Sequence, residues 1–230
     1  MFSERLKIVE EEICSACEKA GRKRGDVTLI AVSKTNPAEA VREAYAAGQL
    51  DFGENKAQEM VAKKAECPEE IRWHFIGNLQ KNKVKYLVGN AVMIHSVSSV
   101  PLAEEIERIA AKKDLVVNVL AEVNIADEAT KHGIGREDAV ALVRAMGGMP
   151  HLSVKGLMCI APPVDDPEEN RPYFAAMRAL RDEINAMELP GVHLKELSMG
   201  MSGDYGVAVE EGATFVRVGT ALFGERHYPV

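Results

Sequence analysis

One lysine of the 230-residue sequence, Lys34, stands where it could act as a nucleophile. It ends the apolar run at residues 28–34, which has the composition of a buried strand. A lysine at the mouth of a closed barrel is partly desolvated, and desolvation favours the neutral amine, which can form a Schiff base with a carbonyl compound. The other interpretation is that Lys34 is a solvated loop residue, the usual role of a lysine at a strand end.

Two segments rich in small residues, 198–203 and 219–220, could hold a phosphate group. They lie at the last two apolar runs of the sequence, residues 193–200 and 214–223. Barrels of alternating strands and helices most often bind phosphate after their seventh and eighth strands. Glycines there let backbone N–H groups approach the phosphate oxygens, while the hydroxyls of Ser202 and Thr220 can donate hydrogen bonds. A lysine Schiff base combined with a phosphate site indicates pyridoxal 5'-phosphate (PLP) as the cofactor.

Arg217 lies two residues before the second phosphate segment. Its guanidinium would therefore lie near the far edge of a pyridine ring held between the lysine and the phosphate. A guanidinium does not readily give up a proton, so opposite the ring nitrogen it would keep that nitrogen unprotonated and weaken the ring as an electron sink. An ion pair with a carboxylate such as Glu122 is the other interpretation of Arg217.

The elements that must position these residues are eight short apolar runs, which we interpret as buried strands. They lie at residues 28–34, 49–55, 72–78, 93–99, 116–124, 154–161, 193–200 and 214–223. Each gap is long enough for a crossover helix, and this alternation produces a parallel sheet. We therefore predict an α/β fold, a single (β/α)8 barrel of the TIM type that forms one domain over residues 1–230. The main rival, an open doubly wound sheet, would normally show a glycine-rich dinucleotide fingerprint that this sequence lacks.

Helix signals lie between the apolar runs. Asn36-Pro37 and Asp166-Pro167 each provide an N-cap residue followed by a proline at the first helical position. Residues 1–21 form an extra predicted helix before the first strand, and we expect it to pack outside the barrel. Its apolar face is made by Leu6, Val9, Ile13, Cys17 and Ala20.

Composition and charge exclude several classes of partner. The net charge of −7 would repel a nucleic-acid backbone, so nucleic acid is not an expected partner. No stretch approaches the roughly 20 apolar residues of a membrane span, so we expect no membrane association. Four cysteines without the spacing of a secreted framework indicate a cytoplasmic location. Cys14 and Cys17 lie on the predicted outer helix and are interpreted as two packed thiols.

The segments that carry these residues resemble the YggS/PROSC family of pyridoxal phosphate homeostasis proteins over nearly the whole chain. The matching segments are AVSKT at 31–35, FGEN at 52–55, WHFIGNLQKNK at 73–83, GLM at 156–158, LSMGMS at 197–202 and VRVGT at 216–220. That family is similar to the N-terminal barrel domain of alanine racemase.

The resemblance implies a set of cofactor-binding residues. It implies a covalent aldimine of PLP on Lys34, a phosphate held by residues of the last two runs, and Arg217 at the pyridine nitrogen. Further residues of the matching segments are expected around the ring. The predicted cofactor-binding residues are Lys34, Asn55, His74, Met158, Ser198, Met199, Ser202, Arg217, Gly219 and Thr220.

The same comparison bears on whether the protein is an enzyme. Racemisation needs a base on each face of the substrate, and alanine racemase takes one from a second domain. This chain ends at Val230, soon after the eighth run, and Tyr205 and Tyr228 are interpreted as packing residues rather than substitute bases. We therefore predict a monomeric, non-catalytic protein of intracellular PLP homeostasis that buffers PLP and hands it to apo forms of PLP-dependent enzymes. A slow amino-acid racemase and a lysine-dependent aldolase are the alternatives.

Overall fold

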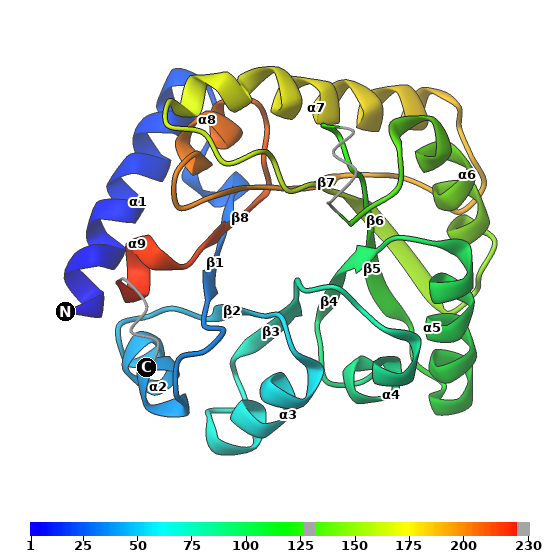
Figure 1. Cartoon of the computed structure of the whole chain (residues 1–230), viewed down its shortest axis with the longest axis horizontal. Coiled ribbons are helices and arrows are strands. Elements are labelled where there is room, and N and C mark those ends of the chain that lie inside the picture. The colour runs from blue at the N-terminus through cyan, green and yellow to red at the C-terminus, as the bar shows by residue number, and fades with distance from the viewer. Residues whose placement is uncertain (127–131, 225–230) are drawn as a thin grey trace.

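The computed structural model describes residues 1–126 and 132–224 and contains a closed barrel of parallel strands in the order β1 to β8 (Figure 1). The strands are β1 Thr28–Val32, β2 Asp51–Glu54, β3 Arg72–Phe75, β4 Met93–Val97, β5 Val117–Glu122, β6 Leu152–Met158, β7 Glu196–Met201 and β8 Phe215–Val218. Pairing of β1 with β8 closes the ring, with Ile30 opposite Arg217. The predicted (β/α)8 barrel is confirmed.

Helices surround the strands, as Figure 1 shows. The α-helices are α1 Phe2–Lys19, α2 Ala38–Ala46, α3 Ala57–Glu66, α4 Val84–Leu87, α5 Val100–Lys113, α6 Arg136–Gly147, α7 Arg171–Ala186, α8 Tyr205–Glu210 and α9 Thr220–Phe223. The 3₁₀ helices are η1 Arg24–Asp26, η2 Lys81–Lys83 and η3 Pro167–Asn170. Within residues 1–126 and 132–224, every helix is too short or too polar to cross a membrane.

Each predicted run overlaps one strand, but the boundaries differ: β6 begins two residues before its run, β7 ends one residue after its run, and the other strands end earlier than predicted. The eighth run was expected to extend to residue 223, whereas β8 ends at Val218 and the following residues form α9. Gly219, with φ −114° and ψ −79°, turns the chain out of the extended conformation. At the first run, Lys34 lies in a turn just beyond β1 because Thr35 adopts a left-handed φ of 67°. Helix α2 likewise begins at Ala38, with Pro37 rather than Asn36 at the N-cap position.

The strands are buried on both faces, which explains their continuous apolar runs. Their outward-facing side chains pack under the helices, and Phe52 and Trp73 are among the largest buried residues there. The inward-facing side chains form a smaller apolar cluster: Ile30, Met93, Leu120, Met158 and Phe215. Buried polar residues fill the rest of the barrel interior.

Helix α1 packs outside the barrel against α8 and α9, as predicted (Figure 1). Its buried face includes Val9, Ile13 and Cys17, and the Cys17 thiol is free, so the prediction of a packed thiol is confirmed there. The Tyr205 hydroxyl on α8 donates a hydrogen bond to the Glu12 carboxylate on α1. Burial, together with this carboxylate, raises the pKa of Tyr205. Tyr205 is therefore a packing residue, as predicted.

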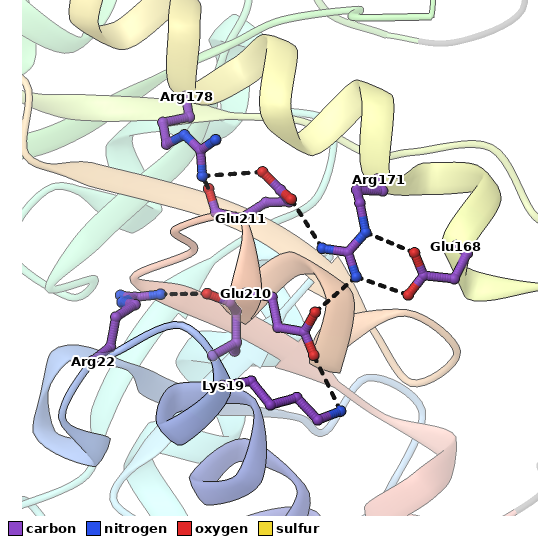
Figure 2. Close-up of polar contacts among 8 residues, drawn as sticks. Lys19, Arg22, Glu168, Arg171, Arg178, Glu210 and Glu211 are labelled. Carbon is purple, nitrogen blue, oxygen red and sulfur yellow. Dashed lines mark hydrogen bonds and ion pairs between the residues drawn. The ribbon is translucent and has the colours of Figure 1, made fainter.

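An ion-pair cluster ties α7 to α8 and to α1 (Figure 2). Arg171 contacts Glu168 through both Nε and Nη2, at 2.6 and 2.8 Å, and also reaches Glu210 at 2.7 Å and Glu211 at 2.9 Å. Glu210 in turn lies 3.3 Å from Lys19 of α1. These carboxylates raise the pKa of the Arg171 guanidinium. A network of this kind holds its geometry better than an isolated surface pair.

Replacing Arg171 with methionine should lower the free energy of unfolding by about 1 kcal/mol, because it leaves Glu210 and Glu211 side by side without their shared cation. Urea unfolding followed by circular dichroism measures the change. Arg108→Met is the matched control, since among the described residues Arg108 pairs with Glu105 of the same helix, and it should leave the stability nearly unchanged. Equal effects of the two substitutions would contradict a stabilising network.

Candidate functional site

A cavity of about 320 Å³ opens at the carboxyl ends of the strands. This is the rim where barrels of this type carry their functional groups. Six of the ten predicted cofactor-binding residues line it: Lys34, Asn55, Ser202, Arg217, Gly219 and Thr220. Apolar side chains complete the wall, from Val32, Ile76, Ile160 and Met201.

The turn that carries Lys34 is fixed by a buried ammonium group, that of Lys63 on α3. Lys63 Nζ donates to the Ser33 carbonyl at 2.8 Å and lies 2.6 Å from Glu54 Oε1 and 2.8 Å from Glu59 Oε1. The same Glu59 oxygen accepts the backbone N–H of Thr35 at 2.8 Å. Both neighbours of Lys34 are thus tied to one cation, which stabilises the left-handed conformation of Thr35.

The two carboxylates around Lys63 differ in their electrostatics. Burial raises the pKa of the fully buried Glu54, and the hydrogen bonds from Lys63 and Ser33 only partly oppose it. Burial acts the same way on Glu59, but Lys63 and the Thr35 N–H outweigh it and lower its pKa. Sequence reasoning missed this cluster. The signal available was Glu59 and Lys63 at a spacing of four residues on one helix face, next to the strand that ends in Glu54.

The two predicted phosphate segments meet at Ser202. Its Oγ accepts the backbone N–H groups of Gly219 at 3.1 Å and Ala221 at 3.3 Å, at the beginning of α9. Gly200 allows the loop to turn back at this point. It has a φ of +91°, and a Cβ there would lie 2.5 Å from the Cβ of Ala208. The turn places the Ser202 hydroxyl beside α9.

Asn55 is held by a close backbone approach. A Cβ on Gly77, which follows β3, would lie 2.3 Å from the Asn55 carbonyl oxygen, so this position requires glycine. The side-chain oxygen of Asn55 is buried and has no hydrogen-bond partner among the described residues. It is therefore an acceptor that a ligand in the cavity could use.

Arg217 reaches the cavity from the barrel interior and is 4% exposed. Its Nη1 donates to Ser198 Oγ at 2.7 Å, and its Nη2 donates to the Cys159 carbonyl at 2.8 Å. Burial lowers the pKa of the guanidinium. The ion pair with Glu122 considered from the sequence is not among the ion pairs of the described residues. Burial raises the pKa of Glu122, and His132 and Arg217 only partly oppose this.

Four predicted cofactor-binding residues do not line the cavity. His74 and Ser198 lie in the barrel interior and are hydrogen-bonded there. Met158 belongs to the apolar cluster inside the barrel, and Met199 belongs to the core between the strands and the helices. Direct contact of these four residues with PLP stays a prediction. Tyr228 lies outside the described residues.

A row of buried polar side chains links Arg217 to the opposite end of the barrel. His95 Nδ1 lies 2.9 Å from Ser198 Oγ, and His95 Nε2 lies 2.9 Å from His74 Nδ1. His74 Nε2 is 3.0 Å from Asp51 Oδ1, and Arg72 Nε donates to the same oxygen at 2.8 Å. Sequence reasoning singled out His74 and Ser198 but missed Asp51 and the contact of His95 with both.

The fold and the cavity define the class of protein. Residues 12–227 match the family model described as alanine racemase, N-terminal domain. The solved alanine racemase of Clostridium difficile 630 has the same fold, with a TM-score of 0.72. It is 16% identical in sequence, and the match covers 99% of this chain and 58% of that one.

Closer relatives specify the family within this class. The pyridoxal phosphate homeostasis protein of Aquifex aeolicus is 48% identical over 98% of both chains. That of Pseudomonas aeruginosa is 41% identical over 99% of this chain and 96% of the relative. PipY of Synechococcus elongatus PCC7942, solved with PLP bound, is 39% identical with a TM-score of 0.84, covering 97% of this chain and all of that one. The chain belongs to the family of pyridoxal phosphate homeostasis proteins.

Replacing Asp51 with asparagine should lower the free energy of unfolding by about 1.5–3 kcal/mol at pH 7, since it removes hydrogen bonds to a charged group. Burial raises the pKa of Asp51, but the hydrogen bonds from Arg72 and His74 outweigh it, so the folded pKa lies below the unfolded value of about 3.9. The stabilisation is therefore complete above the unfolded pKa and is lost as the pH falls through the folded pKa.

Urea unfolding of both proteins between pH 7 and pH 2.5 checks this dependence, and the two stabilities should converge at the acid end. Asp182→Asn is the matched control, because Asp182 is an exposed carboxylate that pairs with Arg181, its neighbour in sequence. A deficit in Asp51→Asn that stayed constant with pH would show that the carboxylate charge is irrelevant.

Proposed function

We propose that this chain binds PLP reversibly and serves PLP homeostasis. The observation that carries the proposal is that Lys34, Arg217 and the Ser202 phosphate segment line one cavity, in a member of this family. A volume of about 320 Å³ is at the lower end of the range of about 300–1,000 Å³ typical of small-molecule sites. It suits a ligand with one ring and one phosphate group.

Lys34 is the residue proposed to bind PLP covalently. The neutral amine of Lys34 would supply the nitrogen of a C=N bond to the aldehyde carbon, and its two N–H protons would leave with the aldehyde oxygen as water. The bond is reversible by the same route, which a buffering function requires. The Lys63 cluster supports this role because it fixes the backbone on both sides of Lys34.

The phosphate group is proposed to lie against Ser202, Gly219 and Thr220. Because Ser202 Oγ already accepts the N–H groups of Gly219 and Ala221, its own hydroxyl proton is the donor left for a phosphate oxygen. The exposed hydroxyl of Thr220 is a second donor at the same place.

Arg217 is proposed to face the pyridine nitrogen, and this argues for a carrier rather than an enzyme. A guanidinium only donates hydrogen bonds, so the ring nitrogen opposite it stays an unprotonated acceptor. An unprotonated ring withdraws electrons weakly and stabilises a substrate carbanion poorly. Among the described residues that line the cavity, Lys34 and Arg217 are the titratable ones, so no second base for racemisation is found in that set.

We further propose that the protein is a cytoplasmic monomer that passes PLP to apo forms of PLP-dependent enzymes. All four cysteines are free, which fits a reducing compartment. The cavity rim carries the partly exposed apolar side chains of Ile160 and Met201, which could contact a recipient.

Replacing Lys34 with alanine should abolish covalent PLP binding. The wild-type protein, loaded with PLP and reduced with borohydride, should carry a stable adduct on the peptide that contains Lys34, as mass spectrometry would detect. Lys56→Ala is the matched control, because Lys56 is exposed and directly follows Asn55 of the cavity wall. Loss of the adduct in Lys56→Ala with retention in Lys34→Ala would overturn the assignment.

PLP-loaded protein should also activate an apo PLP-dependent enzyme without itself turning over amino acids. Recovery of the recipient's activity measures the transfer, and chiral chromatography of L-alanine incubated with the loaded protein measures racemisation. Formation of D-alanine that disappears in Lys34→Ala would favour the racemase alternative instead. A borohydride-trapped carbonyl substrate on a colourless protein would favour the aldolase.

A further inference from the structure

The buried row that begins at Arg217 has charged groups of opposite sign at its two ends. Arg217 lines the cavity at the carboxyl ends of the strands, whereas Asp51 is the first residue of β2, at the amino end. The links between them join Ser198 of β7, His95 of β4 and His74 of β3. All of these side chains are buried, with exposed fractions between 0% and 8%.

The two ends determine which way the hydrogen bonds run. Arg217 has only donors, so Ser198 Oγ accepts from it at 2.7 Å. Asp51 is paired with Arg72 and acts as a carboxylate, which only accepts, so His74 Nε2 carries the proton that faces it at 3.0 Å. Burial, with the Arg217 guanidinium acting in the same direction, lowers the pKa of His95 well below its ordinary value, so His95 is neutral and has one N–H.

One arrangement satisfies every link without adding a proton. Ser198 donates its hydroxyl proton to His95 Nδ1, His95 Nε2–H donates to His74 Nδ1, and His74 Nε2–H donates to Asp51. Both histidines are then neutral with the proton on Nε2. The reverse direction would place the proton of His95 on Nδ1 and would require a second proton on His74, creating a further charge in the barrel interior.

We propose that Asp51 and Ser198 are positioning residues for Arg217, linked through the two histidines, and this inference rests on the proposed function of the cavity. The Ser198 lone pairs face Arg217 because the hydroxyl proton is turned toward His95. Together with the Cys159 carbonyl, they fix the plane of the guanidinium. Three of its five N–H groups then remain for other acceptors. The row thus sets, from the far end of the barrel, the direction in which Arg217 presents its donors to a ligand.

The surroundings of the row isolate it from solvent. The Phe215 ring lies 5.5 Å from the His74 ring and 5.4 Å from the His95 ring, centroid to centroid, and shields both. At the far end, Asp51 and Arg72 border a second cavity of about 220 Å³, together with Glu10 and Arg24. That cavity is the place where the Asp51 end of the row meets solvent.

The histidine ring protons test the direction of the row. A ¹⁵N–¹H correlation spectrum of the whole protein should show both His74 and His95 as neutral Nε2–H tautomers at pH 7.5. In Asp51→Asn the carboxamide can donate as well as accept, so both tautomers of His74 should appear. A proton on Nδ1 of His95 in the wild-type protein would overturn the proposal, whatever the protein binds.

A PLP titration followed by absorption tests the consequence for the cavity. Ser198→Ala removes an acceptor from a buried guanidinium and should weaken PLP binding about tenfold, the effect of one hydrogen bond to a charged group. Ser96→Ala is the matched control. Ser96 is a buried strand residue next to His95, and its hydroxyl has no partner among the described residues, so its loss should leave PLP binding unchanged.

The two experiments separate failure of this inference from failure of the proposed function. A wild-type protein that bound no PLP would overturn the function, and the ring spectrum would still decide the direction of the row. Equal PLP affinities of Ser198→Ala, Ser96→Ala and the wild-type protein would overturn the positioning role while the function stands. Should Asp51→Asn fail to fold, Ser198→Ala and the wild-type spectrum decide alone.

Discussion

A permanent cation buried inside the barrel, the guanidinium of Arg217, is the constraint on which the interior depends. Taking a charge out of water costs several kcal/mol unless hydrogen bonds and opposite charges compensate it. A TIM barrel interior is usually filled by branched apolar side chains. Here β3, β4 and β7 instead contribute His74, His95 and Ser198, and β2 contributes a carboxylate. The polar core therefore follows from placing Arg217 where a ligand can reach it.

A buried cation also holds the turn after β1. Lys34, the proposed cofactor-binding lysine, lies just beyond the end of a strand, where the backbone is less constrained than within the sheet. Lys63, a second buried cation, binds the residues on both sides of that position through Ser33 and Glu59. One side of the cavity is thus held by a helix that packs behind it, and the other side by the barrel interior. Neither set of supporting residues touches the cavity itself.

The sequence was sufficient to predict the barrel, because eight apolar runs separated by helix signals admit few other folds. It also predicted a set of site residues at the strand ends, and the structure brings six of them to one cavity: Lys34, Asn55, Ser202, Arg217, Gly219 and Thr220. The sequence could not tell which of the neighbouring residues Ser198 and Met199 points into the barrel. Parallel strands of a barrel are buried on both faces, so their composition does not alternate, and nothing in the run tells which residue points inward. Pairs such as His74 and His95 depend on register between strands, which single-sequence patterns do not encode.

The contact between α1 and α8 has a consequence for the order of events during synthesis. Glu12 and Tyr205 are 193 residues apart, and the ribosome adds about 5–20 residues per second, so about 10–40 s separate their appearance. A similar interval separates the synthesis of β1 from that of its partner β8. For that interval the nascent chain exposes an unpaired strand edge and an apolar helix face. Helix α1 and strand β1 are therefore translated long before their native partners, and the interval between the two is one in which the nascent chain is exposed to aggregation.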